Sequence, residues 1–204
     1  MGTTDPWTLL VLLAGSAYVA RLWLMDYRAA RAGAPLPQAL PGATPANPRA
    51  VMLACAGALF LLGVETVGEF ALGISQQQSR ITVLFGAYTL AAAFVEELIF
   101  RGYVVLQGRG HALLVTSCIG ASLLFAALHP HLWSWGDQGL SWHFHPKAWF
   151  STAMIFLGSL WFYWVRFWSL NPTWSLLPCI AAHATKNAGV LAIKLAGGYV
   201  TGWW

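Results

Sequence analysis

Three charged side chains stand inside an otherwise apolar stretch of the chain that begins near Ile81: Glu96, Glu97 and Arg101. Among 204 residues the chain has only 11 Lys and Arg and 7 Asp and Glu, so these charges are a large share of a small number. A charged side chain at the centre of a bilayer costs about 2.5–3.5 kcal/mol on insertion scales, and such residues usually face a protein interior or a wet cavity and mark function. The stretch is therefore the first candidate for chemistry.

The spacing within this stretch separates the two acids. Glu97 and Arg101 are four residues apart with the acid first, which is the favourable order for an ion pair on one helical face. Glu96 is rotated from Glu97 by about 100° and points elsewhere. We expect Glu97 and Arg101 to hold each other, which leaves Glu96 available for acid–base chemistry. The alternative, that all three charges only hold helices together, stays open on these residues alone.

Two further pairs of residues have the same i,i+4 spacing, Phe125 with His129 and His183 with Asn187. Each pair shares one face of its helix. If these helical faces meet Glu96, the residues together could form an active site for hydrolysis. Glu96 takes a proton from water, and His129 holds or polarises the same water. His183 and Asn187 donate hydrogen bonds to the oxyanion that forms when water attacks a peptide carbonyl.

The composition predicts what kind of protein surrounds this set. The chain is 58% apolar and 9% charged, whereas soluble domains have about 25% charged residues. This composition indicates a polytopic membrane protein. The net charge of +4 includes no basic run, so we expect the lipid bilayer as a partner and no nucleic acid. Cys55, Cys118 and Cys179 are isolated in apolar segments, which favours small buried side chains over a zinc or redox site.

Apolar spans of about 20 residues predict the fold. We expect an all-α bundle of about six transmembrane helices forming a single domain over residues 1–204, with the three motifs in a catalytic core at 81–196. Residues 26–49, rich in Pro and Ala, are predicted to be an extramembrane linker. Residues 132–147, with Asp137, His143 and His145, are predicted to be a polar aromatic loop. The expected spans are residues 7–25, 50–74, 81–107, 112–129, 148–168 and 173–196.

Six spans place both termini on one side of the membrane. Positive residues concentrate after the first, third and fifth spans, at Arg28, Arg31, Arg49, Arg109 and Arg166, whereas the opposite side has mainly Arg80 and Lys147. The positive-inside rule then predicts that both termini are non-cytoplasmic. The absence of a basic segment before Trp7 favours a retained first helix over a cleaved signal peptide.

Other ionisable residues are interpreted more simply. Glu65 and Glu69 share one helical face, and we favour a surface or structural role for them over a second acidic site. Lys186 is expected to reach the interface or to pair with an acid. His131 is predicted to be a loop or interface residue, like His143 and His145.

Taken together, the three motifs resemble those of the CPBP family of intramembrane proteases, which includes the CAAX prenyl endoproteases and bacterial Abi-type membrane proteins. Glu-Glu-x-x-x-Arg lies at 96–101, Phe-x-x-x-His at 125–129 and His-x-x-x-Asn at 183–187. The resemblance covers about residues 81–194. It implies a glutamate-dependent mechanism without a metal or other cofactor, in which Glu96 activates water, His129 assists, and His183 and Asn187 form the oxyanion site.

The resemblance also implies supporting roles for Glu97, Arg101 and Phe125. It implies a membrane-anchored or lipidated protein as substrate, cleaved near its C-terminus. The chain is compact, which favours a bacterial enzyme of the inner membrane that processes C-terminal sorting signals. Two alternatives stay open. Glu96, His129 and His183 have the composition of a two-histidine, one-carboxylate metal site, as in a metal-dependent protease. A non-enzymatic protein, such as a bacteriocin-immunity factor or a proton-coupled transporter, is the second.

Overall fold

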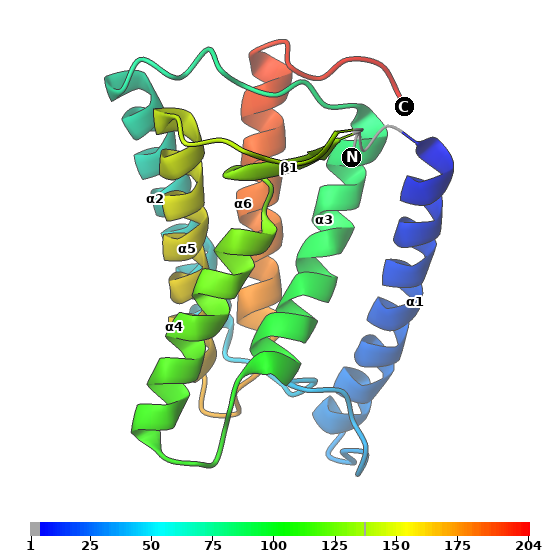
Figure 1. Ribbon diagram of the computed structural model, residues 1–204. Coiled ribbons are helices and arrows are strands. Elements are labelled where there is room, and N and C mark those ends of the chain that lie inside the picture. The colour runs from blue at the N-terminus through cyan, green and yellow to red at the C-terminus, as the bar shows by residue number, and fades with distance from the viewer. Residues whose placement is uncertain (1–4, 137) are drawn as a thin grey trace.

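A computed structural model describes residues 5–136 and 138–204, and Asp137 of the predicted loop and residues 1–4 of the predicted domain lie outside these ranges. The described chain is a bundle of long helices with one small hairpin (Figure 1). The elements in chain order are α1 Pro6–Arg31, α2 Pro48–Ala71, α3 Val83–Glu97, the π-helix η1 Leu98–Val104, α4 His111–Leu128, β1 Trp133–Gly136, β2 Gly139–Trp142, α5 Pro146–Phe167 and α6 Leu177–Ala196.

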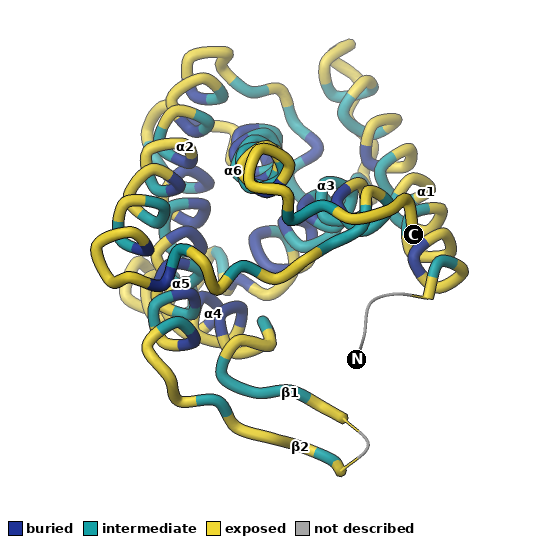
Figure 2. The backbone as a smooth tube through the Cα atoms, turned by 90° about the horizontal axis from the view of Figure 1, so that it is seen from above, coloured by how far each residue is buried: buried dark blue, intermediate teal, exposed yellow. Residues whose placement is uncertain are grey.

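The helices enclose α6. Seen along the bundle, α6 lies inside an arrangement of the other helices, and α1 lies at one edge (Figure 2). α6 packs against α2, α3 and α5, whereas α1 packs against α3. The start of α1 and the C-terminus lie at the same end of the bundle (Figure 1). The helix that bears His183 and Asn187 is thus held from several sides.

Five segments of the described chain are long and apolar enough to cross a membrane: α1, α2, α3 continued by η1, α4 and α5. α6 is not among them, since its sequence includes His183, Lys186, Asn187 and Lys194. Its central position lets these polar groups face other helices instead of lipid. The predicted all-α polytopic membrane bundle is confirmed.

The first connection is shorter than predicted. α1 continues through Arg31, so the segment between α1 and α2 covers residues 32–47 instead of 26–49. Alanines and arginines favour helix beyond the apolar span, which is why the helix does not end where the hydropathy falls. The Asp26 carboxylate then accepts the backbone N–H of Leu40 at 2.8 Å and folds the connection back onto the helix.

The segment predicted as an irregular loop contains an antiparallel hairpin. β1 and β2 pair Trp133 with Trp142 and Gly136 with Gly139, and Gly139 has a φ of 88°. Glycine tolerates that backbone conformation at no steric cost, which permits the tight reversal. The indole N–H of Trp133 donates to the Ala127 carbonyl at 2.7 Å and ties the hairpin to the end of α4.

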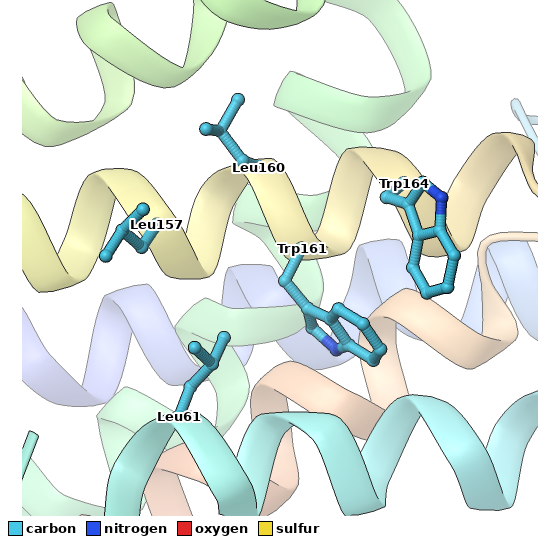
Figure 3. A pocket seen from close by; sticks show the side chains of 5 residues that line it. All are labelled: Leu61, Leu157, Leu160, Trp161 and Trp164. Atoms are coloured by element: carbon cyan, nitrogen blue, oxygen red, sulfur yellow. The ribbon is translucent and has the colours of Figure 1, made fainter. Parts of the chain in front are cut away.

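α2 and α5 approach each other closely. A Cβ atom placed on Gly57 would lie 2.0 Å from the ring of Trp161, so only glycine fits there. The Trp161 indole donates to the Ala54 carbonyl at 3.1 Å. Beside this contact is an open apolar groove of about 430 Å³ (Figure 3). The side chains that line it are Leu61, Leu157, Leu160, Trp161 and Trp164.

Candidate active site

The third helix changes its winding directly after the two glutamates. α3 ends at Glu97 and continues as the π-helix η1. A π-helix changes the backbone hydrogen-bond register, and short π-helical turns occur frequently at functional sites. Side chains of α5 bond to two of its carbonyls. The Tyr163 hydroxyl donates to Phe100 O at 2.6 Å, and Arg166 Nε contacts Arg101 O at 3.4 Å. This turn carries Arg101 into the middle of the bundle.

Glu97 and Arg101 form a fully buried ion pair. Arg101 Nη1 lies 3.0 Å from Glu97 Oε1, and neither side chain has any exposed surface. Arg101 Nη2 also donates to the carbonyl and hydroxyl oxygens of Ser159 at 3.2 and 2.7 Å. The Ser159 hydroxyl in turn donates to Ser122 Oγ at 3.0 Å. The structure thus places the predicted pair in contact and links α3, α4 and α5 through it.

Aromatic rings surround the guanidinium of Arg101. Its central carbon lies 4.8 Å from the ring centres of Phe125 and Tyr163 and 5.2 Å from that of Phe162. A cation over an aromatic face is attracted by the ring, more strongly where water is excluded. These contacts partly replace the hydration that Arg101 gives up on burial.

His183 lies between the two glutamates. Its Nδ1 is 2.7 Å from Glu97 Oε1, and its Nε2 is 3.7 Å from Glu96 Oε2. Its ring stacks on Phe162 with centres 4.9 Å apart. The Glu96 side chain is 32% exposed, whereas that of Glu97 is fully buried. The neighbouring carboxylates therefore have different surroundings, and only Glu96 is open to a reactant.

The remaining motif residues flank this centre. His129 caps the end of α4, and its Nδ1 bonds to Phe125 O at 2.8 Å. The Phe125 ring packs against both imidazoles, with its centre 4.6 Å from the ring centre of His129 and 6.1 Å from that of His183. Within the described residues no hydrogen bond or ion pair joins His129 to Glu96. His129 is adjacent to the centre through Phe125 and does not contact its carboxylates.

Asn187 is one helical turn beyond His183 on α6. Its Nδ2 donates to the Thr89 carbonyl of α3 at 2.9 Å. That bond uses one of the two amide N–H groups of Asn187. The structure therefore directly joins Glu96, Glu97, Arg101 and His183, and it places Asn187 against α3 one turn further along.

Sequence reasoning missed the contribution of α5 to this site. Ser159, Phe162, Tyr163 and Arg166 recur at i, i+3, i+4 and i+7, which places them on one face of that helix. This periodic face, with a serine and an arginine in an apolar helix, was a usable signal. The hydroxyl partner on α4, Ser122, had no such signal, since single serines are common in membrane helices.

The other two acids pair with lysines. Glu65 Oε2 lies 2.9 Å from Lys186 Nζ. Glu69 pairs with Lys147 and accepts a hydrogen bond from Gln78 at 2.5 Å. These contacts agree with the structural role favoured for Glu65 and Glu69. Lys186 was expected either to reach the interface or to pair with an acid, and the contact with Glu65 shows the second.

The metal alternative requires three suitable ligands in one place. Among the described residues, no group of three His, Cys, Asp or Glu side chains has an arrangement that could hold a metal ion. The rings of His129 and His183 both pack against Phe125, and no hydrogen bond or ion pair among the described residues joins His129 to Glu96. The two-histidine, one-carboxylate set thus has the composition of a metal site without its geometry.

Fold and site together define an integral multi-pass membrane protein with a charged, partly open centre between its helices. Residues 78–189 match the family model described as Type II CAAX prenyl endopeptidase Rce1-like. The match covers more than half of the chain and includes all three motifs, and the chain belongs to this family. It is therefore a CAAX-type intramembrane protease in the general sense. No curated protein and no solved structure matches the chain.

Proposed function

We propose that the protein is a glutamate-dependent intramembrane endopeptidase that uses Glu96 to activate water. The observation that carries this proposal is the difference between the neighbouring carboxylates. Glu97 is fully buried against Arg101 and His183, whereas Glu96 is 32% exposed and only approaches His183. A general base must reach the water that it deprotonates, and of these two acids only Glu96 is exposed to do so.

In the proposed reaction, Glu96 takes a proton from water while the water oxygen bonds to the peptide carbonyl carbon. The tetrahedral oxyanion then collapses, the C–N bond breaks, and protonated Glu96 returns its proton to the leaving nitrogen. His129 would orient the water. Its Nδ1 is used by the Phe125 carbonyl, so its Nε2 is left as the acceptor in the neutral ring.

Glu97 is proposed to set the state of His183. An ionised carboxylate only accepts hydrogen bonds, so the contact with Glu97 Oε1 places a proton on His183 Nδ1. The oxyanion role proposed for His183 requires a second proton on its Nε2. Its Nε2–H, on the side of Glu96, would then donate to the oxyanion. The second N–H of Asn187 is the other proposed donor.

The proposed substrate is a membrane-anchored or lipidated protein cut near its C-terminus, such as one with a C-terminal sorting signal. We propose the bacterial inner membrane as the location, with both termini non-cytoplasmic. The end of the bundle opposite the chain ends (Figure 1) is reached by the C-terminal turn of α1 with Arg28 and Arg31, and Arg109 lies in the connection between η1 and α4. This arginine-rich side is the one that the positive-inside rule assigns to the cytoplasm.

The test compares Glu96→Gln with the wild type in cells, by identifying membrane protein C-termini that remain unprocessed. We expect Glu96→Gln to remain in the membrane at wild-type levels and to leave substrates uncut. Glu97→Gln is the matched control, because the same change at a fully buried position should reduce the amount of folded protein. Normal processing by Glu96→Gln would rule out the mechanism.

A further inference from the structure

A second group of ionisable side chains lies outside the proposed catalytic centre, where α2 faces α5 and α6. Glu65 pairs with Lys186, and Glu69 pairs with Lys147. Lys194 Nζ donates to the Ser79 carbonyl at 2.7 Å. Glu65, Glu69 and Lys194 lie outside the segment that matches the family model.

Four polar residues of α6 form a strip along one face of the helix. At 100° per residue, they and Val190 fall within an arc of about 100°. One end of the strip is His183 in the proposed catalytic centre, and the other end is Lys194, about 17 Å away at 1.5 Å per residue. The members of the strip are His183, Lys186, Asn187, Val190 and Lys194.

A polar cavity lies along this strip. Its volume is about 50 Å³, and Glu65, Thr66, Glu69, Gln78 and Lys194 supply its polar lining. A cavity holds water when it has room for at least one molecule and offers two to four polar partners. This one meets both conditions. Leu62, Val190 and Ile193 complete the wall.

Polar residues lie beyond the cavity in two directions, toward the surface and toward the proposed centre. Gln78 and Ser79 belong to the connection between α2 and α3, at the end of the bundle where the chain ends lie (Figure 1). Toward the centre, Glu65 of the cavity wall contacts Lys186, which is three residues from His183 on α6. Polar groups thus extend from the surface along the cavity as far as Lys186, which is about one helical turn from His183.

We propose that this seam, defined by Glu65, Glu69, Gln78, Lys186 and Lys194, is a hydrated path that supplies water to the proposed hydrolytic centre from the end of the bundle with the chain ends. The inference rests on the proposed function, since hydrolysis consumes one water molecule for each bond cut. The outer faces of the long helices carry apolar side chains such as Leu10, Phe60 and Leu123, so a row of polar groups offers water a more favourable route to the centre. The Glu65–Lys186 pair holds α2 against α6, the Glu69–Lys147 pair holds α2 against α5, and both keep charged groups along that route.

The first test does not depend on protease activity. The full-length protein, in nanodiscs, is labelled with hydroxyl radicals made by a short X-ray pulse in ¹⁸O water. We expect Val190 of the cavity wall to take up ¹⁸O several-fold more than Val64, an exposed valine on α2 that faces outward. Labelling of Val190 no greater than that of Val64 would overturn the proposal, whether or not the protein is a protease.

The second test asks whether the path feeds the reaction. Val190→Phe fills the cavity, and we expect it to lower kcat by about tenfold with KM unchanged, which corresponds to about 1.4 kcal/mol of added barrier. Val64→Phe is the matched control and should leave kcat unchanged. If Val190 is labelled but folded Val190→Phe has an unchanged kcat, the cavity contains water that does not supply the reaction. That result would refute the proposed water path.

Discussion

Replacing Arg101 with methionine tests the central ion pair most directly. The substitution removes the 3.0 Å contact with Glu97 and both hydrogen bonds to Ser159, and it leaves a fully buried carboxylate with His183 as its remaining polar contact. Removing one partner of a buried pair costs about 3–5 kcal/mol, because the other charge stays buried without compensation.

For a chain of this size, each kcal/mol lowers the melting temperature by about 2–4 °C, so Arg101→Met should melt about 6–20 °C below the wild type. The assay is thermal unfolding in detergent, followed by tryptophan fluorescence. Arg109→Met is the control, because Arg109 is exposed in the turn before α4 and its replacement should cost no more than about 0.5 kcal/mol.

A double variant separates the ion pair from simple loss of packing. Glu97→Gln combined with Arg101→Met removes both charges, so it should be less destabilised than the sum of the two single variants. If Arg101→Met melts like Arg109→Met, or if the double variant is fully additive, the reasoning about the buried pair is wrong.

Three further measurements test the packing and the chemistry. Gly57→Ala should lower the melting temperature, because the added Cβ would lie 2.0 Å from the Trp161 ring. Gly63→Ala is the control: its Cβ would meet nothing within 4 Å, so it should raise the free energy of unfolding by up to about 1 kcal/mol. Equal effects of the two variants would contradict the close approach of α2 and α5. Tyr163→Phe removes the 2.6 Å hydrogen bond to the Phe100 carbonyl. Because a buried carbonyl then loses its partner, the free energy of unfolding should fall by about 1–3 kcal/mol, measured by the same melting assay. An unchanged melting temperature would show that the hydroxyl does not support the π-helix. Proteolysis in purified protein should persist after exhaustive chelation, with the metal content measured in the same sample; loss of cleavage that is restored by one added metal would favour the metal-dependent alternative.

The sequence predicted the elements that depend on hydropathy and local spacing. The helices α2, α4 and α5 begin and end within a few residues of the predicted spans, because long apolar segments bounded by Pro, Gly or polar residues leave few alternatives. The contact between Glu97 and Arg101 followed from their i,i+4 spacing within one helix. The family followed from the three motifs together.

The sequence did not predict features that depend on tertiary contacts. The π-helical turn has bonds from Tyr163 and Arg166 of another helix, and the sequence of η1 alone gives no sign of it. Spacing placed Asn187 on the same face as His183 but could not show that its amide bonds to the Thr89 carbonyl. The hairpin was missed because its strands are four residues each, too short for a period-2 pattern to be recognised.

The central position of α6 has a consequence for biosynthesis. α6 follows the five other helices in the chain, yet it occupies the space that they enclose. Because one face of α6 is polar, this helix by itself would partition poorly from the translocon into lipid. The five earlier helices must therefore receive it during assembly, and His183 arrives with it. During synthesis, any activity that needs His183 has to wait until this helix has entered the bundle.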